Sequence, residues 1–442
     1  MTCLVLPPEH PKFPAVPVLH AICALASQYT GMVSSPPPTD YTKVPLHEMF
    51  THKYRHGEGS ELSFGDRQAE LARETAQHLE SIGSNLLQVV QANVLLSYYY
   101  CSHARSAELF LTAAHSLRLS VPLKLNVCPP FLSITKTISP DMFPAARTVI
   151  EDETRRNTFW LAYTIERLHG SSNGWAHCID DQDIFQLLPV CHERFQRGHL
   201  VTPSQRQWSH SRDLLLTNPE DQVDPFVLYV KTSIITSKVK GFNMRFRARH
   251  FAGDESVIPV NSVLNEPIDP RDTRSFIELD RIISDFHSTI PSHLQHPIQR
   301  GVVDCILVAV MAIPHLAMIV LHEPHANLCK EECISAQKML RAARAIVDLI
   351  YELWSTSFDL SLLESFMSAP IFQAGRVLGG FLLAIESEVT PDALEHSSIL
   401  QSQIQVCRSA LEQMAQRHAL AGRFVVLIDE MLAKALHVGP AA

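Results

Sequence analysis

The stretch EDETRRNTFWLAYTIERLHGSSNGWAHCIDDQDIFQLLP, residues 151–189, contains the clearest helix signal in this chain of 442 residues. Acidic residues 151–153 open it, whereas Arg167 and His169 stand near its end, and this order of charges complements the dipole of a helix. Gly170 and the small residues after it are typical of a helix end. We therefore predict one long helix that ends just before this glycine.

Helical spacing of apolar residues recurs along most of the chain. The other predicted helices are, in order, 66–82, 86–101, 104–119, 225–249, 273–290, 302–321, 333–354, 370–386, 398–418 and 423–437. Strand signals are almost absent, because neither an Asn-Gly hairpin nor a sustained alternation of apolar and polar residues occurs. The predicted fold class is therefore all-α, a multi-helix array.

The helix predicted at 66–82 illustrates the pattern. Leu71, Thr75, Leu79 and Ile82 fall on one face, and Asp66 is the expected N-cap. The polar, proline-containing stretch that follows the helix of 225–249 reads as a linker or surface loop. We predict three parts: a helical part over 1–250, a linker over 251–272, and a second helical part over 273–442 that packs on the first.

The net charge of −9 arises from 46 acidic and 37 basic residues. Binding to the DNA backbone needs clustered lysines and arginines. The charge therefore argues against this chain being the part that reads DNA, and no DNA-binding residue is predicted.

The ten cysteines are scattered, and no pair has CxxC spacing. This usage predicts a reducing compartment, with most cysteines as small buried side chains. A zinc site built from cysteine pairs is not expected, so no metal ligand is predicted.

Two features bear on targeting and membranes. The N-terminus lacks a basic start and breaks into prolines at once, unlike a signal peptide. Val302–Leu321 is apolar enough to resemble a membrane span, but it contains Asp304, Pro314 and His315. A central aspartate or proline is costly in a bilayer, so we predict a buried core helix and no membrane partner.

Candidate catalytic motifs fail on their context. Gly170–Gly174 matches GxSxG, but a helix precedes it where the hydrolase motif needs a strand. His47 and His52 are five residues apart, whereas a zinc-binding helix needs four. His322 and His325 flank a proline, which favours capping and surface contact. No catalytic residue and no enzyme activity are predicted.

Two charged clusters have more than one reading. Asp180, Asp181 and Asp183 suggest a metal site, but they lack the glycine and distal glutamate of a calcium loop. A solvated turn, or an N-cap followed by a short helix, is favoured instead. A basic run could contact phosphate or direct nuclear import, although a solvated helix end is favoured; it consists of Lys238, Lys240, Arg245, Arg247, Arg249 and His250.

The stretch 151–189 resembles the signature of the fungal-specific transcription factor domain, the regulatory region of fungal zinc-cluster transcription factors. The matching positions are Arg155, Arg156, Phe159, Trp160, Tyr163, Glu166, Arg167, Leu168, Gly174, Asp180, Asp181, Asp183, Ile184, Leu188 and Pro189. Looser similarity to the same family extends over residues 17–30, 107–126, 275–294 and 315–328.

The resemblance implies a nuclear transcriptional regulator, of which this chain is the regulatory helical region. It implies DNA binding and zinc only through the family's N-terminal zinc cluster, which does not precede the first helix here, so no cofactor is expected in this chain. A truncated gene model, a fragment and a regulator without the cluster all remain open. The implied partners are DNA through a missing or separate cluster, a homo- or heterodimer partner, and a small-molecule effector.

Two other functional readings remain open. The chain could be a non-DNA-binding interaction or ligand-sensing module that dimerises with full-length relatives. It could also be an enzyme or a ligand-sequestering helical protein, although no motif favours this reading.

The signature also carries structural expectations. Phe159, Trp160 and Tyr163 are large enough to anchor the helix in the core. Arg155 and Arg156 are expected to pair with the acidic turn at 180–183, because the two clusters have opposite charge.

Overall fold

The computed structural model of the protein describes residues 5–7, 10, 13–33, 62–128, 144–171, 175–257, 269–385 and 391–437. This part of the chain contains thirteen α-helices, joined in places by short 3-10 turns. Its only named strands are β1 (Ile298–Gln299) and β2 (Val302–Val303), which pair in antiparallel orientation. The predicted all-α fold class is confirmed.

The chain forms two compact units. The first unit comprises Met1–Gly170, Trp175–Ser211 and Arg417–Leu420. The second unit comprises Ser171–Gly174, Arg212–Gln416 and Ala421–Ala442.

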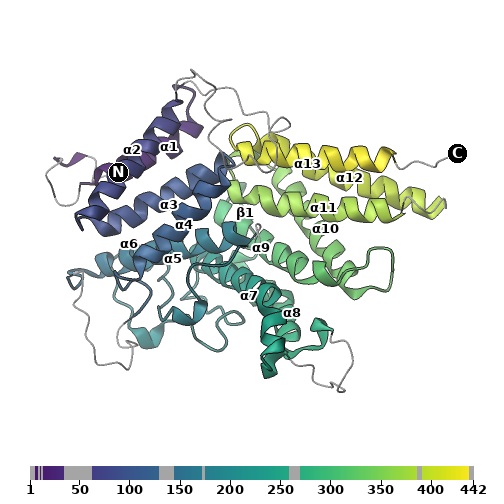
Figure 1. Cartoon of the computed structure of the whole chain (residues 1–442), viewed down its shortest axis with the longest axis horizontal. Coiled ribbons are helices and arrows are strands. Elements are labelled where there is room, and N and C mark those ends of the chain that lie inside the picture. The colour runs from purple at the N-terminus through teal and green to yellow at the C-terminus, as the bar shows by residue number, and fades with distance from the viewer. Residues whose placement is uncertain are drawn as a thin grey trace. The chain divides into compact units, whose positions relative to one another are not determined.

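In the first unit, short side chains let three helices pack closely. Buried alanines face one another from α1, α2 and α3, among them Ala21, Ala69 and Ala92. The distance between packed helices depends on the side chains at their contact, and α1 accordingly lies against both α2 and α3. The helices of this unit are α1 (Val16–Ala26), α2 (Phe64–Ser81), α3 (Leu86–Ser102), α4 (Ser106–Ser120), α5 (Val149–Ser171) and α6 (His192–Gln196), with 3-10 turns η2 (Ser27–Tyr29), η6 (Asp181–Asp183) and η7 (Pro203–Gln205) (Figure 1).

Helix α2 differs from the expectations in its start, its N-cap and its buried face. It begins earlier than predicted, and Ser63 caps it by accepting the N–H of Asp66 at 3.0 Å. Asp66 is therefore not the N-cap; its carboxylate instead accepts hydrogen bonds from Arg105 (2.9 Å) and Tyr99 (3.0 Å). The buried face consists of Gly65, Ala69, Ala72 and Ala76, not of Leu71, Thr75, Leu79 and Ile82, because α1 approaches the small residues.

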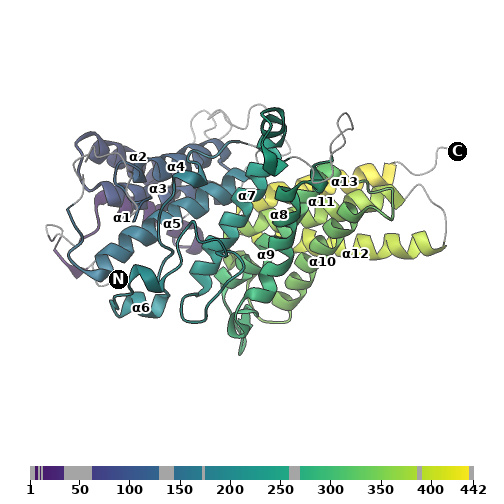
Figure 2. The ribbon, with the colours of Figure 1, turned by 90° about the horizontal axis from the view of Figure 1, so that it is seen from below.

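The second unit is built around the apolar helix α9, which packs against α7, α8, α10 and α11 (Figure 2). The helices are α7 (Pro225–Phe251), α8 (Arg274–Phe286), α9 (Cys305–His322), α10 (Ile334–Trp354), α11 (Ser368–Ile385), α12 (Pro391–Met414) and α13 (Ala419–His437). The 3-10 turns are η8 (Glu255–Val257), η9 (Pro270–Asp272), η10 (His287–Thr289), η11 (Ser292–Leu294), η12 (Glu323–His325), η13 (Leu360–Leu362) and η14 (Ser365–Met367).

Two segments of this unit are long and apolar enough to cross a membrane by length and composition. They are Cys305–His325 and Ser365–Ile385, and 72% and 56% of their apolar windows are buried inside the protein. A core helix of a globular protein has the same composition. The buried helix expected at Val302–Leu321 is found as α9, although residues 302 and 303 belong to β2.

The border between the units differs from the expected division at residue 250. It lies near Ser211, because α7 packs against α8 and α9 and so joins the second unit. Of the expected linker over 251–272, the structure describes 251–257 and 269–272, which include η8 and η9. The middle of this segment lies outside the described residues.

Helices α11, α12 and α13 meet at Gly375. A Cβ added there would lie 3.0 Å from the Cδ1 of Ile428 and 3.3 Å from the Cβ of Cys407. In α7, by contrast, a Cβ added at Gly241 would find no atom within 4 Å.

We predict that Gly375→Val lowers the free energy of unfolding by about 1–3 kcal/mol, because the added methyl groups overpack the contact of three helices. The matched Gly241→Val should be neutral or stabilising, because valine has a higher helix propensity than glycine. Urea unfolding followed by circular dichroism measures both. Equal effects at the two positions would contradict the close packing at Gly375.

Candidate functional site on helix α5

One face of α5 carries the polar and aromatic residues of the signature. Glu153, Arg156, Trp160, Tyr163 and Arg167 follow one another at intervals of three or four residues, so they project from the same side of the helix. All five are buried, with exposed fractions of 0–6%. This face covers the segment that returns after the helix.

The covered segment is extended and pairs with two others. Residues 126–128 lie parallel to 184–186, where the N–H of Cys128 donates to the carbonyl of Phe185 at 2.7 Å. On the other side, the N–H of Leu188 donates to the carbonyl of Gln207 at 2.8 Å. The backbone of the segment is thereby held from both edges, while α5 supplies its cover.

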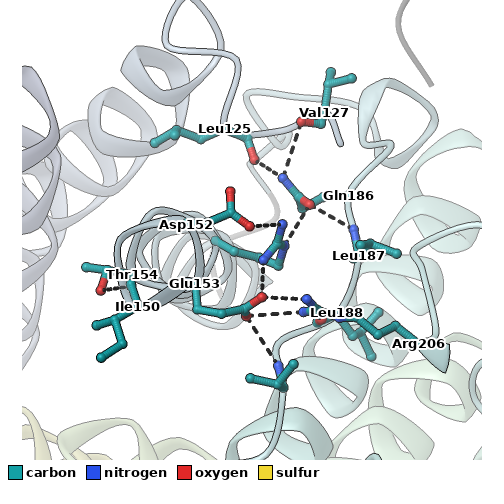
Figure 3. A network of polar contacts seen from close by, with 12 residues as sticks. Leu125, Val127, Ile150, Asp152, Glu153, Thr154, Gln186, Leu187, Leu188 and Arg206 are labelled. Atoms are coloured by element: carbon teal, nitrogen blue, oxygen red, sulfur yellow. Dashed lines mark hydrogen bonds and ion pairs between the residues drawn. The ribbon is translucent and has the colours of Figure 1, made fainter. Parts of the chain in front are cut away.

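A buried ion network joins the beginning of α5 to this layer (Figure 3). The carboxylate of Glu153 accepts hydrogen bonds from the guanidinium groups of both Arg156 and Arg206. Arg156 also donates to Asp152 at 3.0 Å, and Arg206 donates to the carbonyl of Leu188. Two arginines thus share one buried carboxylate.

Gln186 forms the centre of the layer, as Figure 3 shows. Its Oε1 accepts hydrogen bonds from Arg156 Nε (3.0 Å) and from the N–H of Leu187 (2.9 Å). Its Nε2 donates to the carbonyls of Leu125 (2.8 Å) and Val127 (3.4 Å). Both the oxygen and the nitrogen of the amide therefore form hydrogen bonds. They connect α5 to the segment of Gln186 itself and to the segment of Leu125 and Val127.

The network depends on its pairing, because an isolated charge is costly to bury. Burial, together with the nearby charge of Arg156, lowers the pKa of Arg206, although Glu153 counteracts this shift. The side chains of Glu153 and Arg206 are only 4% and 6% exposed. Removing either side chain would therefore leave the other with fewer partners for a buried charge.

Aromatic rings fill the middle of the face. The indole N–H of Trp160 donates to the carbonyl of Leu187 at 2.7 Å. The ring centroid of Trp160 lies 5.2 Å from that of Phe159 and 5.3 Å from that of Tyr163, both in edge-to-face geometry. The prediction that these three aromatic residues are buried is confirmed.

A second ion network lies at the end of α5. Arg167 is fully buried and binds Glu166, Asp181 (3.0 Å) and the carbonyl of Ile179 (2.7 Å). Its guanidinium carbon lies 4.5 Å from the ring centre of Tyr163, whose hydroxyl also donates to Asp181. Burial opposes the charge of Arg167, but Tyr163, Asp181 and Glu166 outweigh it, so the pKa of Arg167 is raised.

The acidic turn has the form of a capped short helix, one of the two forms predicted for it. The carboxylate of Asp180 accepts the N–H of Gln182 at 3.0 Å and caps η6. The carbonyl of Asp183 accepts a hydrogen bond from the side chain of Asn126 at 2.8 Å. Gly174 of the signature lies outside the described residues.

The expected pairing of Arg155 and Arg156 with this turn is wrong for Arg156, which binds Asp152, Glu153 and Gln186 instead. Arg155 forms its ion pair with Glu151, four residues earlier on the same helix, at 2.6 Å. The arginine that holds the acidic turn is Arg167. It stands nearer the end of α5, where the chain turns back toward Asp181.

Other candidate motifs have local structural roles or lie outside the described residues. The histidines at 47 and 52, and residues 172–174 of the GxSxG match, are among the latter. His322 does not make a surface contact: it is buried, with Nε2 2.9 Å from Asp280 Oδ1 and Nδ1 3.0 Å from Ser335 Oγ.

The basic run forms the end of α7. Arg245, Arg247 and Arg249 are exposed, which agrees with the solvated helix end favoured from the sequence. Arg249 pairs with Asp254 at 2.7 Å. Lys240 differs from this expectation, because it is only 4% exposed.

The residues that the structure describes do not fit the zinc cluster that the resemblance implies. Within the described ranges, no three side chains of histidine, cysteine, aspartate or glutamate come together as a metal site needs. The described cysteines are free thiols. A zinc cluster of the family would have to be held by other residues.

Sequence reasoning missed three members of the site: Glu153, Gln186 and Arg206. From the sequence alone, Glu153 is treated only as an acidic residue that complements the helix dipole. Its spacing to Arg156 and Trp160, however, places it on the buried face. Gln186 gives no local signal, because an isolated glutamine between apolar residues is usually exposed. Arg206 comes from a distant loop, and only the folded chain brings it to the helix.

The arrangement suits holding a segment in place. Its charged and polar groups contact one another, the backbone of residues 178–190 or the backbone of Leu125 and Val127. The model of the Fungal specific transcription factor domain matches residues 12–303 of this chain, a range that includes the whole face of α5.

Curated proteins also show similarity. A transcription factor of Emericella nidulans is 26% identical over 161 residues, which are 36% of this chain and 22% of that protein. The ascochitine biosynthesis cluster transcriptional regulator of Didymella fabae is 28% identical over 116 residues, 26% of this chain and 19% of that protein. The asperfuranone cluster transcription factor of Emericella nidulans is 31% identical over 123 residues, 25% of this chain and 18% of that protein.

These matches span about a fifth of the length of each of the three relatives. No solved structure matches the chain significantly.

We predict that Arg167→Met lowers the free energy of unfolding by about 3–5 kcal/mol, because it leaves the buried carboxylate of Glu166 without its cation. Arg197→Met is the matched control: Arg197 pairs with Glu193 on the surface, where both side chains are 73% exposed. The control should change stability by less than about 1 kcal/mol. Denaturant unfolding distinguishes the two, and a similar loss in both variants would contradict the buried network.

Acid should destabilise the protein through His169. His169 is buried on α5 with Nδ1 3.3 Å from the Sγ of Cys101, and burial lowers its pKa to about 3. The unfolded chain takes up a proton at this residue as the pH falls below about 6.5, whereas the folded chain does not. Stability is therefore lost as the pH falls, by about 2 kcal/mol between pH 8 and pH 5 for this residue.

The measurement is the free energy of unfolding of the wild type and of His169→Gln at pH 8 and at pH 5. The decrease on acidification should be smaller in the variant by about 2 kcal/mol. Parallel pH profiles would show that His169 does not carry this dependence.

Proposed function

Because this chain belongs to the family of proteins with the fungal specific transcription factor domain, we propose that it is the regulatory helical region of a transcriptional regulator. The domain match over residues 12–303 carries this proposal. The three relatives described above are all named as transcription factors or transcriptional regulators, which supports the same class of function. We assign no catalytic role to the chain.

The charge of the chain supports the proposal that DNA contact and regulation belong to different parts of the regulator. With a net charge of −9, its average surface repels the DNA backbone. We therefore propose that contact with DNA is made through a zinc cluster formed by residues other than those described here, or by a partner. We propose that the helical region restrains or presents this DNA-binding part. A dimer partner or a small-molecule effector would control that action.

The buried face of α5 supports a role as a rigid element within this region. Each end of the face carries an ion network, and the aromatic centre binds the backbone between them. A segment held at several points along its length transmits a displacement, whereas a loose loop would absorb it.

We propose nuclear localisation for this protein, since a regulator of transcription acts in the nucleus.

A narrower candidate function concerns the target genes. Two of the relatives are named for the ascochitine and asperfuranone clusters. We propose that this protein likewise regulates the genes of a biosynthetic cluster. Transcript profiling of a deletion strain tests this candidate: the affected genes should lie next to one another on a chromosome, and a scattered set would contradict it.

The general proposal is tested by tethering the chain to a reporter gene. The chain is fused to a heterologous DNA-binding domain whose sites lie upstream of the reporter, and transcription is compared with that of the DNA-binding domain alone. We expect a change in transcription, because the fusion brings the regulatory region to a promoter. The sign of the change shows whether the region activates or represses.

Two variants serve as controls in this assay. Arg167→Met breaks the buried network and should abolish the effect, whereas Arg197→Met breaks an exposed pair and should preserve it. Immunoblotting and imaging must show that all fusions are present in the nucleus. A wild-type fusion that is nuclear and folded, yet leaves the reporter unchanged, would contradict the proposal.

A further inference from the structure

The loop between η12 and α10 carries two free cysteines, Cys329 and Cys333, separated by three residues. Cys329 is exposed, and Cys333 is partly buried directly before α10. Asn327 contacts both of them. Its N–H donates to the Sγ of Cys333 at 3.3 Å, and its Oδ1 accepts the N–H of Cys329 at 3.1 Å. The loop therefore folds both cysteines around one residue.

The surroundings of Cys333 favour a thiolate. The pKa of its thiol is lowered, most of all by the N–H of Asn327 and then by that of Ala336, while Arg271 adds a nearby positive charge. As a neutral thiol, Cys333 donates only a weak hydrogen bond to the carbonyl of His325, at 3.8 Å. The thiolate, which is the nucleophilic form, therefore has better partners than the thiol.

Other cysteines of the described ranges have different surroundings. Burial raises the pKa values of the Cys178, Cys305 and Cys407 thiols. Buried thiols of this kind react slowly. Cys333 thus combines a stabilised thiolate, partial access to solvent, and a second thiol in the same loop.

We propose that Cys333 and Cys329 form a redox pair that a hydroperoxide oxidises to a disulfide within the loop. The Cys333 thiolate attacks the outer oxygen of the hydroperoxide, the O–O bond breaks, and the other oxygen leaves as an alcohol or as water. The resulting sulfenic acid is attacked by Cys329, which forms the S–S bond and releases water. In sum, two thiols and one hydroperoxide give one disulfide, one water and one alcohol or second water.

The pair lies beside a polar junction of three helices. Two residues after Cys333, Ser335 binds His322 of α9 at 3.0 Å, and His322 binds Asp280 of α8 at 2.9 Å. Lys338 of α10 also binds Asp280. A disulfide would draw the sulfur of Cys333 away from Asn327 at the first turn of α10, so oxidation would alter the end of α10 that makes this junction.

Thiol labelling tests the first half of the proposal. The purified full chain is treated with a limiting amount of N-ethylmaleimide at pH 7, and mass spectrometry follows each cysteine. Cys23 is the internal control, because it is exposed on α1 and its nearest cysteine in the sequence is twenty residues away. We expect Cys333 to be labelled on the order of fivefold faster than Cys23, because its thiolate is stabilised.

Oxidation tests the second half. With hydrogen peroxide as the probe, wild-type protein should form the Cys329–Cys333 disulfide. Cys329→Ser should instead accumulate a sulfenic acid on Cys333, which dimedone traps, and Cys333→Ser should leave Cys329 reduced. Serine is close to cysteine in size, and circular dichroism shows whether each variant is folded.

Three results would each overturn the proposal: labelling of Cys333 no faster than of Cys23, oxidation of Cys329 at an unchanged rate in Cys333→Ser, or a wild-type disulfide between other cysteines. These measurements use the isolated chain and no reporter gene. Their outcome is therefore independent of the proposed role in transcription.

Discussion

The buried charges on one face of α5 are the constraint on which the signature region depends. An arginine or glutamate taken out of water is tolerated only with a partner of opposite charge and with its hydrogen bonds made. Some of the partners lie on α5 itself, as Glu166 does for Arg167, whereas Asp181 and Arg206 come from outside the helix. The helix and the returning segment must therefore fold together. The aromatic rings between the two ion networks add apolar contact, but the charges determine which segment lies under the helix.

This arrangement explains why the region can serve regulation without a catalytic group. Its polar side chains bind the protein's own backbone, as Gln186 does with the carbonyls of Leu125 and Val127. The second unit uses the same principle at a smaller scale, where His322 joins α8 to α10 through Asp280 and Ser335. In both units a buried polar group fixes one arrangement of neighbouring elements, whereas apolar packing alone would allow several.

Most of the helices could be predicted from the sequence. The spacing of apolar residues and the glycines and prolines that end helices are properties of short segments. The buried face of α2 could not be predicted, since alanines carry little hydrophobic signal and become core only when α1 approaches them. The aromatic anchors of α5 were predictable from their size. The partners of Arg156 and Arg167 were not, because two arginines on one helix are equivalent until the returning segment is placed.

The sharing of Glu153 between two arginines also has an evolutionary consequence. A substitution at Glu153 leaves Arg156 and Arg206 without the carboxylate that they share, whereas the loss of one arginine still leaves Glu153 paired with the other. A tolerated replacement of Glu153 must therefore accompany or follow the loss of one of the arginines. Among related chains these three positions should covary, and a lineage that has replaced the glutamate should have lost an arginine from helix α5 or from the loop that follows η7.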